Sequence, residues 1–310
     1  MLYYGCYTVL GVLGGNIFNF LRLRKYIHRE NIIFSELHIK RHIKPVLKVF
    51  SFSVVTSIYL QLNTVLLGFL KNALAVGYFA AATKVMQMLL QMSSCLGSVM
   101  MPRASHLIAE NKESEFNTLI QKSYDFTLAI AMPMTVGLIF CAPSLITALC
   151  GVKFENSILP SQIIAPIILM VAISNVFGIQ VLFPKGKINI VTLCCAIGAV
   201  TDLILNLCLI PFFSYIGTAI AYLGAEVATT VSMYFIGRKY LPITYFKRNH
   251  LNYLLGCILM AIALYAIGKL QFPTLTILIL QGCCGILVYF LLLCLRKDAF
   301  LMQVLSKIKK

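Results

Sequence analysis

Charged residues are scarce in this chain of 310 residues, and acidic ones are the scarcest of them. Only 12% of the residues are charged, and 10 Asp and Glu stand against 26 Lys and Arg. With 60% hydrophobic residues, this scarcity excludes an ordinary soluble domain. The apolar segments also lack the polar alternation of a transmembrane β-barrel. We therefore expect an all-α polytopic membrane protein, because helices satisfy their own backbone hydrogen bonds in lipid.

Patterns typical of metal centres and membrane-embedded enzymes are also missing. The 11 cysteines show no CxxC or Cys/His ligand spacing, so we interpret them as packing residues. The five histidines lie in or beside expected cytoplasmic loops. There is no large outer loop of the kind expected in a polysaccharide polymerase, and no acyltransferase His followed five residues later by Asp. We expect no enzymatic activity, no metal and no cofactor.

Long apolar segments are what the chain has in abundance. Each contains about 18–26 residues, which suits a hydrocarbon core of roughly 30 Å at 1.5 Å per residue. We predict nine transmembrane helices, at residues 2–20, 49–70, 76–101, 124–141, 160–183, 188–209, 214–236, 251–269 and 274–295.

Positive charge alternates between the connections of these segments. The odd-numbered connections and the tail carry 22 of the 26 Lys and Arg, whereas the even-numbered ones carry Lys71, Lys153 and Lys269. Because short basic loops stay cytoplasmic, this pattern predicts a multi-pass protein of the bacterial cytoplasmic (inner) membrane with its C-terminus inside. Membrane insertion and anionic lipids also explain the net charge of +16, so we expect membrane lipids as partners and no nucleic acid.

The segments fall into four predicted parts. Residues 1–20 would be a single span that starts outside, and residues 21–48 a basic amphipathic linker on the cytoplasmic surface. Residues 49–240 would form six spans, and residues 241–310 a terminal helix pair with a basic tail. Six-span blocks joined by a cytoplasmic linker are typical of transporters built from repeated halves. On this interpretation the chain is the back part of a longer protein.

Lys84 is the one basic residue inside a predicted span, and a polar stripe follows it. Gln87, Gln91, Ser94 and Ser98 lie three or four residues apart on the same helix face. One interpretation is a cavity wall whose cation faces an anionic headgroup or phosphate. The alternative is a lysine that snorkels outward while the amides bond neighbouring helices.

Other polar groups at membrane depth are further candidates. In the second span, Gln61 and Asn63 are expected to contact substrate, or else to pack against another helix. Asp202 and Glu226 lie at similar depth on either side of a hairpin and could bind protons or sodium. They could equally pair with Lys84, form a structural ion pair or stay protonated.

Prolines and one further acid have more local interpretations. Pro133 and Pro166 are expected to break the fourth and fifth spans, as hinges for alternating access or as static kinks. Asp125 is interpreted as a charge at the N-terminus of the fourth span.

Three stretches together resemble the polysaccharide-export flippases, Wzx-type O-antigen and capsule repeat-unit translocases of the MATE-like MOP superfamily. They are YLQLNTVLLGFLKNALAVGYFAAATKV, ITALCGVKFENSILPSQIIAPIILM with the later FPKGKINI, and NLCLIPFFSYIGTAIAYLGAEVATT. The resemblance implies a C-terminal six-helix lobe plus two terminal helices, with the N-terminal lobe lacking. It also implies that Lys84 faces a lipid pyrophosphate, and that Asn63 stands where many relatives carry Asp.

The expected function is therefore the flipping of polyprenyl-pyrophosphate-linked oligosaccharide across the membrane for surface polysaccharide biosynthesis. A proton or sodium gradient would drive alternating access, and other polysaccharide-assembly membrane proteins are candidate partners. A MATE-type drug/cation antiporter and a lipid II flippase are alternatives within the superfamily. A membrane-embedded polysaccharide enzyme and an inactive remnant of a truncated gene are the alternatives outside it.

Overall fold

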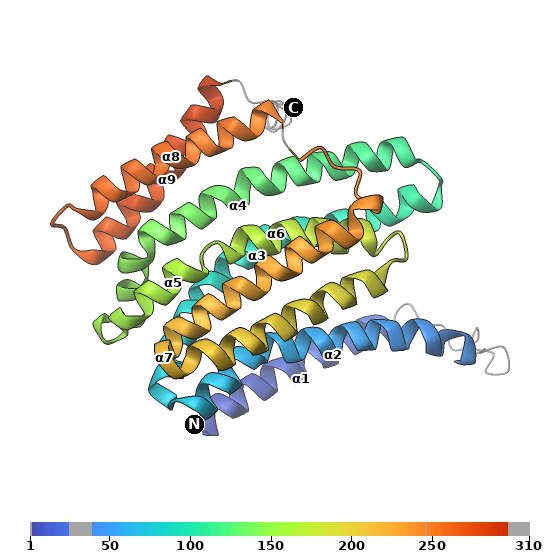
Figure 1. Ribbon diagram of the computed structural model, residues 1–310, viewed down its shortest axis with the longest axis horizontal. Coiled ribbons are helices and arrows are strands. Elements are labelled where there is room, and N and C mark those ends of the chain that lie inside the picture. Colours follow the sequence, from blue (N-terminus) through green and yellow to red (C-terminus); the bar gives the residue numbers. More distant parts are fainter. Residues whose placement is uncertain (1, 25–38, 246, 297–310) are drawn as a thin grey trace. The chain divides into compact units, whose positions relative to one another are not determined.

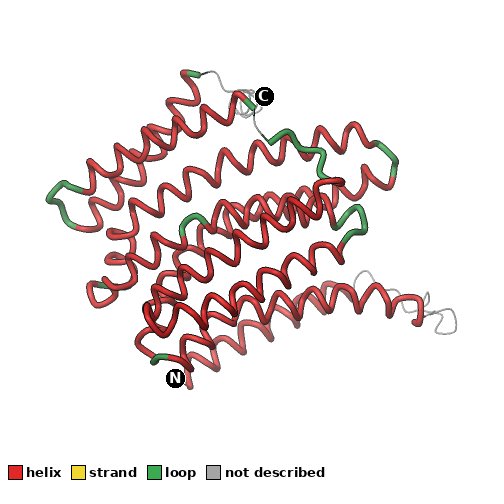
Figure 2. Tube along the Cα trace, in the orientation of Figure 1, coloured by secondary structure: helices red, strands yellow, loops and turns green. Residues whose placement is uncertain are grey.

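The computed structural model describes residues 2–24, 39–245 and 247–296, and the regular structure in these ranges is helical throughout (Figures 1 and 2). The chain divides into two compact units, Met1–Leu47 and Lys48–Lys310. In the first unit, α1 spans Leu2–Arg24 and contains the apolar stretch Val9–Leu23. Much of the predicted linker at 21–48 and of the basic tail lies outside the described residues. The four-part division stays a prediction.

The second unit is a bundle of helices and short helical breaks. α2 spans Ile39–Leu70 and enters this unit at Lys48. The remaining elements are α3 (Ala73–Ala109), α4 (Glu113–Cys150), η3 (Val152–Ser157), α5 (Ile158–Ile164), α6 (Ile167–Asn175), η4 (Val176–Leu182), α7 (Ile188–Gly237), η5 (Arg238–Tyr240), α8 (Arg248–Gly268) and α9 (Thr274–Leu295).

Two apolar clusters hold the second unit together. One joins α4 to the α8–α9 pair through residues such as Tyr124, Tyr253 and Tyr289, whose hydroxyl donates to the Ala129 carbonyl at 2.7 Å. Figure 1 shows α8 and α9 lying side by side, with α4 as their neighbour in the bundle. The other cluster joins residues of α2, α3, α4, α5, α6 and α7, among them Leu67, Met86 and Ile168. Large apolar side chains such as Phe69 are exposed, as expected where lipid, not water, covers the surface.

Six helices in the described residues are long and apolar enough to cross a membrane, or seven if one bent pair counts as a span. That number includes α7 once, although its backbone is not helical at Ser214. The chain is thus a multi-pass helical membrane protein, as predicted. Nine spans are compatible with these helices, and the count of nine stays a prediction.

α7 is a hairpin of two antiparallel helices, visible as two rods in Figure 1. The break comes at Ser214, which has φ +51° and ψ −130°, close to the predicted connection between 209 and 214. The turn is tight: a Cβ at Gly217 would lie 2.6 Å from the Leu209 carbonyl oxygen. Only glycine therefore fits at that position without moving the backbone.

The predicted fifth span at 160–183 is interrupted. α5 and α6 belong to a pair bent by 43°, and Pro166 lies between them. Proline has no backbone N–H, so the helix cannot continue its hydrogen-bond ladder there, and Ile168 N donates instead to Ala165 O at 3.0 Å. The span then ends in a π-helix, η4. The predicted break at Pro166 is thus present. The predicted break at Pro133 is absent, because α4 continues through this proline.

Candidate functional site

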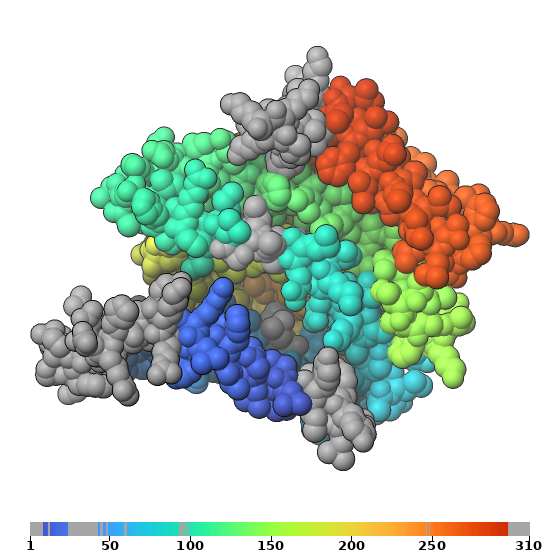
Figure 3. Space-filling model, turned by 180° about the vertical axis from the view of Figure 1, so that it is seen from behind, coloured from blue at the N-terminus to red at the C-terminus, as the bar shows by residue number. Residues whose placement is uncertain are grey.

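An exposed polar side runs along α3. Lys84, Gln87 and Gln91 are all exposed, and so is Gln61 on α2. In the view from behind, part of α3, in cyan and turquoise, lies open on the surface (Figure 3). The structure therefore brings three predicted substrate contacts onto one helix side and leaves them accessible. The side chains of Ser94 and Ser98, which would extend the stripe, lie outside the described part.

Lys84 is deeper in its helix than the sequence suggested. α3 begins at Ala73, where Asn72 caps it by accepting a 2.9 Å hydrogen bond from Ala75 N. Lys84 follows that start by about 16 Å of helix, roughly half of a 30 Å hydrocarbon core. Within the described residues Lys84 has no ion pair. The acids considered as its partners thus lie elsewhere, and its charge is open to a ligand.

A second polar group is buried between α2 and the first half of α7. The Asn206 amide nitrogen donates to Asn63 Oδ1 at 2.9 Å and to Asp202 Oδ1 at 3.1 Å. Asp202 and Asn206 are completely buried, and Asn63 is 3% exposed. We call Asn63, Asp202 and Asn206 the buried triad. Helix geometry separates Asn63 from Gln61, because residues two apart do not face the same side.

Two oxygens of the buried triad lack a hydrogen-bond partner in the described part of the chain. These are Asp202 Oδ2 and Asn206 Oδ1, and both are shielded from solvent. An unsatisfied buried acceptor costs about 1–3 kcal/mol, and more when it is charged. Carboxylate and amide oxygens of this kind can accept a proton or a hydrogen bond, or coordinate a cation.

Glu226 lies on the second half of α7, close to the buried triad. It is 5% exposed and lies near enough to Asp202 and Tyr222 for an electrostatic interaction when it is ionised. Both acids lie twelve residues from Ser214, about 18 Å of helix on either arm of the hairpin. The hairpin therefore places Asp202 and Glu226 at similar depth, as predicted. The small residues that pack its two arms together, among them Gly198 and Gly224, allow this approach.

Several features of this region were not found from the sequence. Asn206 lies one turn after Asp202, as their spacing of four residues indicates, but no sequence pattern linked it to Asn63 on another helix. In η4, Gln180 is buried and accepts a 2.5 Å hydrogen bond from Ser123 of α4. π-Helices occur often at functional sites, but no sequence pattern announced this one. Among the residues that the structure describes, no group of three or more His, Cys, Asp or Glu side chains could hold a metal ion.

The interpretation of Asp125 was wrong. α4 begins at Glu113, three turns earlier, so Asp125 is not near its N-terminus. Polar residues before the apolar window simply continue the same helix. The Asp125 carboxylate instead accepts from Lys247 Nζ at 2.9 Å and lies 3.1 Å from His250 Nε2. Its role is to tie α4 to the start of α8.

Solved structures of transporters share this arrangement of helices. One described as "Lipid II flippase MurJ, inward closed conformation" superposes with a TM-score of 0.73 at 19% identity, covering 93% of this chain and 61% of that one. An outward-facing multidrug resistance MATE family transporter of the MOP superfamily gives a TM-score of 0.57 at 17% identity, covering 79% and 60%. The fold is therefore that of the MOP-superfamily transporters.

Comparison of sequences adds relatives with named roles to this similarity of fold. Residues 8–159 match a family model described as "Polysaccharide biosynthesis protein". Relatives in Escherichia coli (strain K12) and Shigella dysenteriae, both named "Putative O-antigen transporter", are 26% identical over 196 and 227 residues. These matches cover 63% and 72% of this chain, and 47% and 56% of the relatives. The predicted resemblance to Wzx-type flippases is thereby confirmed, and the chain spans about half the length of the curated relatives it matches.

Proposed function

We propose that this chain forms part of a flippase that moves polyprenyl-pyrophosphate-linked oligosaccharide repeat units across the cytoplasmic membrane. The observation that carries the proposal is Lys84 on the open side of α3, which has no ion pair among the described residues and has Gln87 and Gln91 beside it. A pyrophosphate needs a cation at the level of its passage, and sugar hydroxyls pair well with side-chain amides. Gln61 of α2 would add a further amide.

The lysine also bears on the alternatives within the superfamily. A drug/cation antiporter would favour an acidic or aromatic surface, and a cation at Lys84 would repel its substrate. A lipid II flippase would use the same pyrophosphate chemistry, and the fold is compatible with it. The relatives named as O-antigen transporters favour a surface-polysaccharide repeat unit.

We further propose that the buried triad and Glu226 couple transport to a proton or sodium gradient. Asp202 and Asn206 supply the two oxygens that lack partners in the described part, and Asn63 supplies a third. Asn63 would then contribute to the ion site more than to the substrate surface, and its burial supports this assignment. Because the triad joins α2 to α7, binding or loss of the cation would change how these two helices pack.

The first prediction tests the substrate role of Lys84 in cells that carry the gene in its natural context. Lys84→Gln should reduce export of the surface polysaccharide at least about tenfold, since a lost charged hydrogen bond is worth roughly 1.5–3 kcal/mol. Lipid-linked repeat units should accumulate inside, and chromatography of extracted lipids would measure them. Lys84→Arg should retain most of the activity.

Lys122→Gln is the matched control, because Lys122 is also an exposed lysine but belongs to α4 and not to α3. It should leave export unchanged. Equal export by the Lys84→Gln and Lys122→Gln variants, at equal protein levels, would contradict the proposed contact. The function itself would be contradicted if cells without a redundant transporter still made normal surface polysaccharide after deletion of the gene.

A further inference from the structure

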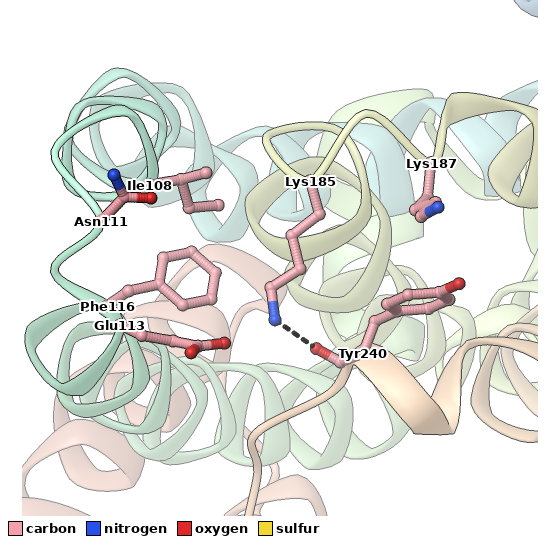
Figure 4. Close-up of a pocket in the computed structure, with 7 residues that line it drawn as sticks. All are labelled: Ile108, Asn111, Glu113, Phe116, Lys185, Lys187 and Tyr240. Atoms are coloured by element: carbon pink, nitrogen blue, oxygen red, sulfur yellow. Dashed lines mark hydrogen bonds between the residues drawn. The ribbon is translucent and has the colours of Figure 1, made fainter.

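A cavity of about 490 Å³ opens at the end of the second unit where α3 passes into α4 (Figure 4). Its walls come from this connection, from the turn that precedes α7 and from η5. The buried triad and Lys84 do not line it. The cavity is therefore a feature separate from the proposed transport surface.

Two lysines enter the cavity from the turn before α7. The Lys185 ammonium lies 5.1 Å from the centroid of the Phe116 ring and donates to the Tyr240 carbonyl at 3.2 Å. The Lys187 ammonium lies 5.1 Å from the centroid of the Tyr240 ring. Rings and a carbonyl hold both cations in place without neutralising them. No carboxylate of the described residues lies within 4.0 Å of either ammonium.

The positioned lysines can still donate hydrogen bonds. Each ammonium has three N–H groups, and the carbonyl of Tyr240 uses one of those on Lys185. The Asn111 side chain, from the α3–α4 connection, lines the same cavity and offers an amide. This combination suits a phosphate-type anion, which accepts several charge-assisted hydrogen bonds at once.

An acid on the wall narrows the choice of ligand. Glu113, the first residue of α4, points into the same cavity as Lys185 in Figure 4. Its carboxylate would repel a multiply charged anion but would pair with an ammonium group. The two cations and one anion are thus complementary to a zwitterion that joins a phosphodiester to a primary amine.

The depth of the cavity indicates where such a zwitterion comes from. The first arm of α7 runs from Ile188 to Pro211, about 36 Å by helical rise, which exceeds a hydrocarbon core of roughly 30 Å. A helix of that length that crosses the core can place the turn carrying Lys185 and Lys187 at the level of the lipid headgroups, and the basic loop is consistent with that level. At that depth the lipid headgroups are the phosphates at highest concentration.

We propose that this cavity binds the phosphoethanolamine headgroup of a membrane phospholipid. Lys185 and Lys187 hold the phosphodiester, and Glu113 holds the ammonium. The lipid would bridge the α3–α4 connection to the base of the α7 hairpin, independently of what the protein transports.

The test uses the purified full chain, stripped of lipid in detergent and offered equal amounts of phosphatidylethanolamine, phosphatidylglycerol and phosphatidylcholine. Native mass spectrometry counts the retained lipids. Phosphatidylethanolamine should dominate, and the Lys185→Gln/Lys187→Gln double variant should retain about tenfold less of it. The charge-preserving Lys185→Arg/Lys187→Arg variant should retain it, which guards against misfolding as the explanation. Lys122→Gln should behave like the wild type.

Glu113→Gln separates recognition of the amine from recognition of the phosphate. It should reduce the preference for phosphatidylethanolamine over phosphatidylglycerol about fivefold, without loss of phosphatidylglycerol. An unchanged preference would overturn the assignment of the amine, and unchanged retention by the lysine-to-glutamine double variant would overturn the site. If soluble phosphoethanolamine raises the Tm as much as the lipid does, a membrane source is excluded.

Discussion

Among single residues, Asp202 is where the structure changes the interpretation most. From the sequence it was one of two acids at membrane depth with several possible partners. In the structure its partner is Asn206, which in turn bonds Asn63. Lys84 stays outside this network, on the exposed side of α3. The two functional tasks that we propose, substrate contact and ion coupling, therefore fall on different residues.

The ion site gives a prediction that does not depend on transport. If the triad binds sodium, the Tm of the purified protein should be a few degrees higher in sodium than in potassium. Asp202→Asn should abolish that difference, because it removes the charge that holds the ion. If the triad binds a proton, the wild type and Asp202→Asn should instead differ in how their Tm depends on pH. Identical responses of both proteins to both treatments would contradict the site.

Gly198 gives a second prediction at this scale. A Cβ at this position would overlap Thr229 Oγ1 on the other arm of α7. Gly198→Leu should therefore destabilise the protein by roughly 1–3 kcal/mol, as overpacking does, and thermal unfolding in detergent would measure it. Gly282→Ala on α9 is the control, because nothing lies within 4 Å of its added Cβ. If the Gly198→Leu protein were as stable as that control, the two arms of α7 would pack less closely than the structure shows.

Among the elements, α8 and α9 form a pair that polar contacts fix to α4. The Asp125 carboxylate meets Lys247 and His250 at the start of α8, and Gln121 donates to it at 2.8 Å. Gln281 of α9 accepts a 2.5 Å hydrogen bond from Ser144 of α4. Such bonds fix the position of the pair, since apolar side chains alone gain little from leaving lipid for a helix surface.

Removal of the Asp125 charge should loosen this attachment. Asp125→Asn removes the carboxylate that pairs with Lys247 and His250. We expect the free energy of unfolding to fall by about 1–2 kcal/mol, because the Asp125 side chain is only partly exposed. Limited proteolysis of the connection between α7 and α8, together with the Tm, would detect it. Glu115→Gln, an exposed acid on the same helix, should have a smaller effect. The opposite ranking would contradict the role of Asp125.

At the scale of the whole molecule, the open side of α3 and the partial coverage of the relatives point the same way. The chain spans about half the length of the O-antigen transporters it resembles. Polar residues on α3 are exposed at membrane depth, where exposure to lipid would be costly. We therefore expect a polar surface rather than lipid to face this side during transport.

The orientation of the whole chain is testable by reporter fusions. Alkaline phosphatase, which is active only outside the cytoplasm, should be active when fused after Lys153 and inactive when fused after Lys239 or at the C-terminus. A fluorescent protein that folds in the cytoplasm should show the reverse at the same positions. The physical reason is that short basic loops are retained on the cytoplasmic side. Activity of the phosphatase at the C-terminus would reverse the topology.

Much of this protein could be determined from its sequence, because the membrane imposes strong and simple constraints. Helical class, most span positions and the α7 hairpin follow from the length of apolar runs and the need for internal hydrogen bonds. Lys84, Asp202 and Glu226 stood out because charge is costly in lipid. The resemblance to polysaccharide flippases rested on three stretches of sequence and was confirmed by the family match together with the relatives named as O-antigen transporters.

Only the tertiary structure determined the contacts between residues far apart in the chain. The bond between Asn63 and Asn206 joins residues 143 positions apart, and no pattern within either helix specifies it. The π-helix at η4 and the unbroken course of α4 through Pro133 depend in the same way on neighbouring helices. Hydrophobic periodicity fixes which segments cross the membrane. Close packing between those segments fixes which polar atoms meet, and therefore where a substrate, an ion or a lipid can bind.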